Sequence, residues 1–136
     1  FFFLLILLIC LATDIGGYFF GKLFKGPKLT KISPNKTYAG MMGSFLLSIL
    51  STIIYLDNLT FLSLSYPNIE MGVKIVFIVL STSFVSQVGD LIISYFKRRS
   101  KIKNTGKIIP GHGGILDRID GMIFAFPYAF LLTKII

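Results

Sequence analysis

The feature that most constrains the fold of this chain is a series of long apolar stretches separated by short polar segments. A helix needs roughly 20 mostly apolar residues to cross the hydrocarbon core of a bilayer, and 54% of the 136 residues are hydrophobic. The pattern predicts an all-α, polytopic transmembrane helix bundle with about four spans. The last stretch is short and contains Pro127, which is expected to kink it. The stretches are residues 1–20, 37–56, 71–96 and 120–136.

The composition also excludes other classes of protein. A disordered chain would be poor in aromatic and apolar residues, and a disulfide-stapled secreted domain would need more than the single Cys10. The chain begins inside an apolar stretch at Phe1, without a methionine or a basic leader. We therefore expect it to be the C-terminal part of a longer protein, in which residues 1–136 form a single membrane-embedded domain.

Charged residues predict how the spans are oriented. Residues 21–36 contain five lysines and no acid, and residues 97–119 contain seven basic residues. Residues 57–70, in contrast, contain two acids and no base. Because basic loops stay on the cytoplasmic side of a membrane, the first and third segments are expected to be cytoplasmic and the second external. Topology alone requires positive charge there, and no nucleic-acid partner is expected.

A polar stripe runs through the third apolar stretch. Its members are spaced four, three, four and three residues apart, which places them on one face of a helix, and Ser86 lies beside them. Such a stripe can hold neighbouring helices together through hydrogen bonds. It also contains the carboxylate of Asp90 and leads into three consecutive bases, which favours the wall of a site for an anionic ligand. The stripe consists of Ser83, Gln87, Asp90, Ser94 and Lys97.

A glycine-rich segment precedes the fourth stretch. Gly113 and Gly114 follow His112 and allow the backbone to present N–H groups to phosphate oxygens. Asp117 and Asp120 come next, three residues apart and therefore on one helical face. Mg²⁺ is commonly held by one or two carboxylates together with substrate phosphates. The segment predicts metal-assisted phosphoryl or nucleotidyl transfer at the cytoplasmic face, the alternative being that these acids merely pair with nearby bases.

The first basic segment carries similar residues. Asp14 lies in the first stretch, just before a pair of glycines, and Ser33, Lys36 and Thr37 precede the second stretch. All four are candidates for substrate binding. Ser33 or Thr37 could instead cap a helix, and Lys36 could instead anchor the chain at the lipid surface.

Together these residues resemble the signature of the phosphatidate cytidylyltransferases (CDP-diglyceride synthases). That pattern has a Ser, a Lys-Arg pair, four further residues, a Lys-Asp pair, and a His-Gly-Gly block followed by Asp-Arg and a last Asp. Residues 94–120, SYFKRRSKIKNTGKIIPGHGGILDRID, follow it, and ATDIGGYFFGKLF and SPNKTYAG resemble two further blocks, so that the likeness covers residues 10–134. The matching positions are Ser94, Lys97, Arg98, Lys103, His112, Gly113, Gly114, Asp117, Arg118 and Asp120.

The resemblance implies that CTP and phosphatidate react to give CDP-diacylglycerol and pyrophosphate for phospholipid biosynthesis. It implies a homodimer integral to the bacterial inner membrane, with Mg²⁺, alone or with a second cation, in a site facing the cytoplasm. Asp90, Asp117 and Asp120 are expected to bind the metal. The residues expected to act in catalysis are Asp90, Lys97, Arg98, His112, Asp117 and Arg118. Those expected to bind substrate are Asp14, Ser33, Lys36, Thr37, Ser86, Gln87, Ser94, Lys103, Gly113 and Gly114.

Two positions depart from the family pattern. Asn104 stands where Asp is usual, and Lys25 stands where Gly is common. Since Asn and Asp share turn geometry, Asn104 is expected to keep a hydrogen-bonding or loop-ordering role.

Two other functions share features with this sequence. Asp117, Asp120 and Gly121 match the start of the motif of CDP-alcohol phosphatidyltransferases, but Phe124 and Ala125 occupy its Ala-Arg positions, so this match fails. The remaining alternative is a transporter with Asp90 on the ion or substrate pathway, although transport sites lie near the middle of the membrane.

Overall fold

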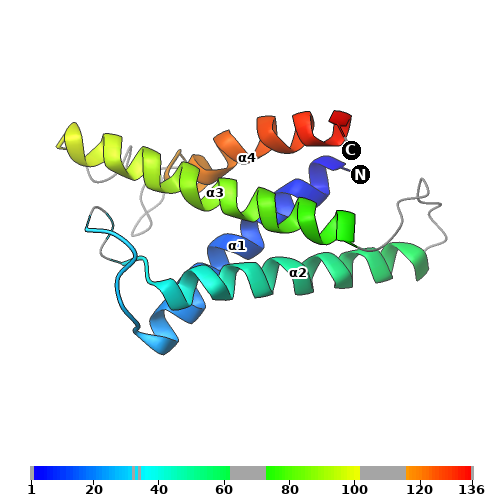
Figure 1. Cartoon of the computed structure of the whole chain (residues 1–136), viewed down its shortest axis with the longest axis horizontal. Coiled ribbons are helices and arrows are strands. Elements are labelled where there is room, and N and C mark those ends of the chain that lie inside the picture. The colour runs from blue at the N-terminus through cyan, green and yellow to red at the C-terminus, as the bar shows by residue number, and fades with distance from the viewer. Residues whose placement is uncertain (1, 32, 34, 62–72, 102–115, 136) are drawn as a thin grey trace.

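The computed structural model describes residues 2–31, 33, 35–61, 73–101 and 116–135, and the side chains of these residues except 59–61, 116–119 and 133. This part of the chain forms four helices and no named strand, which confirms the all-α prediction (Figure 1). The helices are α1 (Phe2–Phe24), α2 (Tyr38–Phe61), α3 (Val73–Arg99) and α4 (Leu116–Ile135).

Within the described residues, three helices are long and apolar enough to cross a membrane. They are Phe2–Phe24, Tyr38–Asn58 and Val73–Arg99, and α4 contributes a shorter apolar helix, Asp120–Leu132, with Pro127 inside α4. The fourth predicted span is thus the shorter helix. This is the arrangement of an integral membrane protein.

The helices extend beyond the apolar stretches that predict them. Residues 57–61 belong to α2, although the sequence places them in the external loop, and Lys97–Arg99 form the last turn of α3 rather than a loop. Polar side chains outside the hydrocarbon core remain in water while their backbones continue helical hydrogen bonding, so the end of an apolar run does not mark the end of a helix. The bases in the last turn of α3 also interact favourably with the helix dipole.

The described ends of the two basic segments lie toward the same end of the bundle. The C-terminal ends of α1 and α3 and the N-terminal ends of α2 and α4 all lie toward the left of the view in Figure 1. This is the arrangement that the predicted topology requires. The opposite half of the bundle holds two apolar clusters, one around Ile9 and Val79 and the other around Cys10 and Ala125.

Helices α1 and α2 approach each other at backbone distance near the basic end. A Cβ atom added at Gly16 would lie 2.8 Å from the carbonyl oxygen of Gly43 and 2.9 Å from the Cα atom of Ser44. Small residues at such a crossing allow membrane helices to gain close packing contacts. The crossing matters for the site because Thr13 and Asp14 lie one turn before Gly16 on the same helix.

We predict that Gly16→Ala destabilises the full-length protein by about 1–3 kcal/mol, because the new methyl group meets α2 backbone rather than a movable side chain. The thermal unfolding midpoint in detergent should fall accordingly. Gly26→Ala is the matched control, since a Cβ there would lie 3.8 Å from the Cβ of Ala39, an ordinary contact. Equal midpoints for the two variants would contradict the close approach.

The segment between α1 and α2 is a closed loop rather than an open linker. Helix α1 ends at Phe24, and Lys25 takes a positive φ of 38°, a conformation that favours glycine. The loop then folds back on itself. The Leu29 N–H donates to the Lys36 carbonyl (2.7 Å), and Lys28 and Thr37 form an isolated antiparallel β-bridge. The loop thereby fixes the backbone of Lys36 beside the first turn of α2.

Candidate functional site

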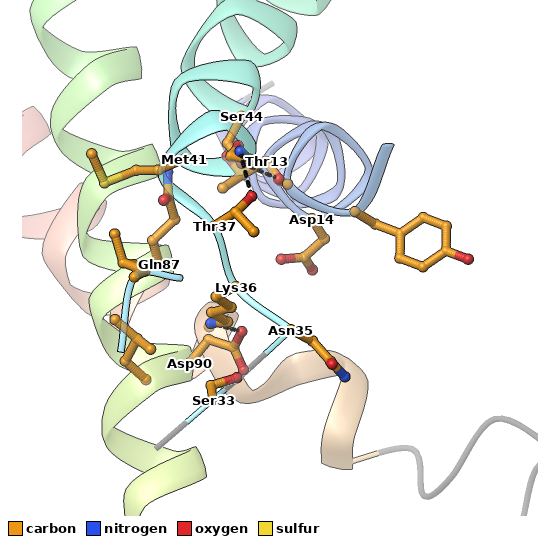
Figure 2. A pocket seen from close by; sticks show the side chains of 16 residues that line it. Thr13, Asp14, Ser33, Asn35, Lys36, Thr37, Met41, Ser44, Gln87 and Asp90 are labelled. Carbon is orange, nitrogen blue, oxygen red and sulfur yellow. Dashed lines mark hydrogen bonds and ion pairs between the residues drawn. The ribbon is translucent and has the colours of Figure 1, made fainter. Parts of the chain in front are cut away.

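A cavity of about 280 Å³ lies at the basic end, between α1, α2, α3 and the loop that joins α1 to α2. Figure 2 shows side chains from all four of these elements converging on it. Six residues predicted from the sequence to take part in the site line it together: Asp14, Ser33, Lys36, Thr37, Gln87 and Asp90. Gly121 in the first turns of α4 completes the wall next to Asp120.

Lys36 and Asp90 form an ion pair across this cavity. The Lys36 Nζ donates to Asp90 Oδ2, and the two side chains are 28% and 30% exposed. The pair joins a loop residue to the polar face of α3, 54 positions away in the sequence. Lys36 therefore points into the cavity, where its ammonium group has a partner in Asp90.

Thr37 serves as the N-cap of α2 as well as lining the cavity. Its Oγ1 accepts a hydrogen bond from the backbone N–H of Gly40 (3.1 Å), the interaction expected of a threonine that precedes a helix. The capping interpretation is confirmed for this residue. Ser33 makes local contacts, with its N–H donating to Thr30 Oγ1 and its carbonyl accepting from Lys36 N–H.

A buried hydroxyl network forms the floor of the cavity. Thr13 Oγ1 bonds to the Ile9 carbonyl (2.7 Å) and to Ser83 Oγ (2.8 Å), and Ser44 Oγ donates to the Thr13 carbonyl (2.7 Å). These bonds tie α1, α2 and α3 together where the acids of the site emerge. Thr13 and Ser44 were not among the predicted site residues. The signal for Ser44 is its place in a four-residue repeat with Ser48 and Thr52, all three buried.

The polar stripe of α3 combines both functions that the sequence left open. Ser83 makes an interhelical hydrogen bond to Thr13 of α1, whereas Gln87 and Asp90 line the cavity. Ser94, farther along the stripe, is half-buried and does not line it. Ser86 faces α4, because a Cβ added at Gly121 would lie 2.6 Å from Ser86 Oγ, and it is not among the cavity residues.

Gln87 has an unused donor in the structure. Its Nε2 atom is buried and has no hydrogen-bond partner among the described residues. A buried polar atom without a partner is costly and calls for an explanation. A bound ligand that accepts a hydrogen bond in the cavity would satisfy it.

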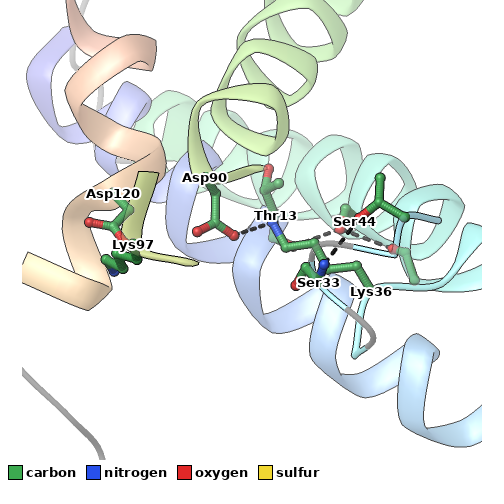
Figure 3. Close-up of polar contacts among 9 residues, drawn as sticks. Thr13, Ser33, Lys36, Ser44, Asp90, Lys97 and Asp120 are labelled. Carbon is green, nitrogen blue, oxygen red and sulfur yellow. Dashed lines mark hydrogen bonds and ion pairs between the residues drawn. The ribbon is translucent and has the colours of Figure 1, made fainter. Parts of the chain in front are cut away.

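A second ion pair joins α3 to α4 outside the cavity. Lys97 Nζ donates to Asp120 Oδ2, and the two side chains are only 13% and 5% exposed (Figure 3). The sequence assigns Lys97 to phosphate binding and Asp120 to the metal, and the structure pairs these two residues with each other. Arg98, the next residue, is exposed at the end of α3.

The remaining predicted residues lie outside the described part of the chain. Asp117 and Arg118 belong to the first turn of α4, but their side chains are not described. Among the described side chains, no group of three or more His, Cys, Asp or Glu residues could hold a metal ion. The residues that fall outside altogether are Lys103, Asn104, His112, Gly113 and Gly114.

The described donors nevertheless suit Mg²⁺. Asp90 and Asp14 offer carboxylate oxygens in the cavity, and hydroxyl and amide oxygens surround them. Hard oxygen donors of this kind, with one or two carboxylates and the rest from substrate and water, are what Mg²⁺ binds. The oxygen donors of the cavity therefore fit a magnesium ion.

Comparison with known proteins gives a consistent result. The Cytidylyltransferase family matches residues 1–136 of the chain. Proteins named phosphatidate cytidylyltransferase are similar over most of it: that of Bacillus subtilis is 39% identical over 129 residues, 91% of this chain and 44% of the relative. That of Staphylococcus saprophyticus is 37% identical over 92% of this chain and 46% of the relative, and that of Brucella suis 38% over 91% and 43%. The chain spans about half the length of the curated relatives it matches.

Proposed function

Since the chain belongs to the Cytidylyltransferase family, we propose that it carries the site at which CTP and phosphatidate are converted to CDP-diacylglycerol and pyrophosphate. The observation that carries this proposal is the cavity itself. It places the Lys36–Asp90 pair and the Gln87 amide at one end of a membrane helix bundle. There it can meet both a water-soluble nucleotide and a lipid headgroup.

The reaction brings two anions together, so charge neutralisation and positioning should carry most of the catalysis. A phosphate oxygen of phosphatidate attacks the α-phosphorus of CTP, and the bond from that phosphorus to the β-phosphate oxygen breaks to release pyrophosphate. Lys36 binds phosphate oxygens in the cavity, and Ser33, Thr37 and Gln87 orient the substrate through hydrogen bonds. Asp14 offers an acceptor for substrate hydroxyl or amino groups.

In this proposal Asp90 would hold the metal together with Asp117 and Asp120 from the start of α4, and Asp120 would first give up its pair with Lys97. When bound, Mg²⁺ supplies positive charge that polarises the phosphate oxygens and neutralises the leaving pyrophosphate. Arg98, His112 and Arg118 are proposed to stabilise charge on the phosphates, and Lys97 could join them only if its ion pair with Asp120 opened. Ser86, Ser94, Lys103, Gly113 and Gly114 are proposed to complete the substrate site. The full protein acts as a homodimer with the site on the cytoplasmic side, where the positive-inside rule puts both basic segments.

The transport alternative receives less support from the position of the cavity. Ser33, Asn35 and Lys36, which belong to the loop, line it, so it opens at the end of the bundle. A transport site would lie near the midplane, commonly at broken helices.

The test is a transfer assay with membranes that contain the full-length protein. Labelled CTP, phosphatidate and Mg²⁺ should yield a labelled CDP-lipid, while diacylglycerol in place of phosphatidate should yield none, because it lacks the attacking phosphate. Absence of a labelled lipid with phosphatidate, from protein shown to be folded in the membrane, would refute the proposal.

A further inference from the structure

We infer that Lys36 couples metal binding to nucleotide binding by exchanging its contact with Asp90 for a contact with a substrate phosphate. This inference rests on the proposed function and assigns Lys36 a role beyond that of a fixed phosphate ligand. In this structure the ammonium group neutralises Asp90. When a divalent cation takes over that neutralisation, Lys36 turns to the nucleotide.

The position of Lys36 suits such an exchange. Its backbone is held on both sides, with its carbonyl accepting from Leu29 N–H (2.7 Å) and its N–H donating to the Ser33 carbonyl (3.1 Å). Its side chain, in contrast, is 28% exposed within the cavity, and a flexible four-carbon stem carries its ammonium group. The ammonium group can therefore move between partners without displacement of the loop.

The ion pair between Lys97 and Asp120 differs from the Lys36–Asp90 pair in its surroundings. Lys97 and Asp120 lie between two packed helices, are 13% and 5% exposed, and do not line the cavity. An ammonium group enclosed in this way has no cavity into which to turn. Of these two lysine–aspartate pairs, the geometry therefore assigns the exchange to Lys36–Asp90.

Electrostatics makes the two binding events depend on each other. A divalent cation on Asp90 would lie within a few ångströms of the ammonium group, and like charges at that distance repel strongly in a partly desolvated site. Metal alone must therefore compete with Lys36, and CTP alone finds Lys36 occupied by Asp90. Together, metal and CTP satisfy all the charges, and the affinity gain is the same for either ligand by linkage.

The experiment measures binding, not turnover, on the full-length protein in detergent. Mn²⁺ alone is titrated by electron paramagnetic resonance, CTP alone by calorimetry, and each is then titrated with the other at saturation. For the wild type we expect each ligand to tighten the other about tenfold, within the usual range of coupling between sites. In Lys36→Met, Mn²⁺ alone should bind about tenfold more tightly, CTP with metal should bind more weakly, and the mutual tightening should disappear.

Two further variants serve as controls. Lys31→Met alters an exposed lysine of the same loop that does not line the cavity, and it should behave as the wild type. Lys36→Arg keeps the charge and should keep the coupling, which also covers the case in which Lys36→Met fails to fold.

The outcomes separate this inference from the proposed function. If Lys36→Met weakens CTP binding but leaves the Mn²⁺ affinity unchanged or lower, Lys36 is a fixed phosphate ligand and the coupling is overturned. If Lys36→Met fails to fold and the folded Lys36→Arg variant loses the coupling in spite of its charge, the coupling is likewise overturned. If the folded wild type binds neither Mn²⁺ nor CTP, the proposed function itself fails.

Discussion

Asp90→Asn is expected to lower the rate of CDP-lipid formation at least about 100-fold, the effect of removing one preorganised electrostatic group from a reaction centre. Asparagine keeps the shape of the side chain but not its charge. It therefore removes the anionic ligand for a divalent cation, while Lys36, freed of its pair with Asp90, can still reach the nucleotide. The loss acts on the chemical step, because the two phosphates approach only when their charge is neutralised.

The measurement is the initial rate in membranes at several Mg²⁺ concentrations, with protein levels equalised. Asp57→Asn is the matched control, because Asp57 is exposed near the far end of α2 and does not line the cavity. Its rate should stay within about twofold of the wild type, as exposed ion contacts contribute little. A near-normal rate for Asp90→Asn at ordinary Mg²⁺ would exclude Asp90 as a metal ligand. Asp117→Asn tests a second member of the proposed metal site in the same assay.

The fold could be predicted from hydropathy because backbone groups inside a bilayer must be satisfied within each segment, which leaves helices as the main solution. The positions at which the helices end could not be predicted from hydropathy. Helix α1 runs on to Phe24 and α2 to Phe61, past the apolar residues that predict them, because backbone hydrogen bonding continues where side chains return to water.

The site was predictable to the extent that helical spacing determines a shared face. Gln87 and Asp90, three residues apart on α3, do line one cavity. Spacing along one helix does not, however, reveal the partner on another element. The Lys36–Asp90 and Thr13–Ser83 contacts join residues 54 and 70 positions apart, and they depend on how the loop and α1 pack on α3.

For Lys97, too, the sequence did not reveal the partner on another helix, and here the partner changes the role that the residue is expected to have. Its place in a basic cluster suggests phosphate binding, but its ammonium group donates to Asp120 on α4 between packed helices. We predict that Lys97→Met destabilises the protein by about 3–5 kcal/mol, since it removes a cationic partner of a carboxylate whose side chain is only 5% exposed. The thermal unfolding midpoint of the full-length protein should drop strongly, whereas Lys101→Met, at an exposed position just beyond the helix, should leave it unchanged.

A double variant separates the structural role of Lys97 from a role in substrate binding. Replacing both members of a buried ion pair with apolar residues of similar size is often neutral or stabilising, because no charge is then left in the interior. Lys97→Met combined with Asp120→Leu should therefore regain most of the stability lost in Lys97→Met alone. If Lys97→Met keeps the wild-type midpoint and loses only activity, the ion pair contributes little to the fold and Lys97 acts on substrate. If the double variant regains stability but not activity, at least one of the two residues serves the reaction as well.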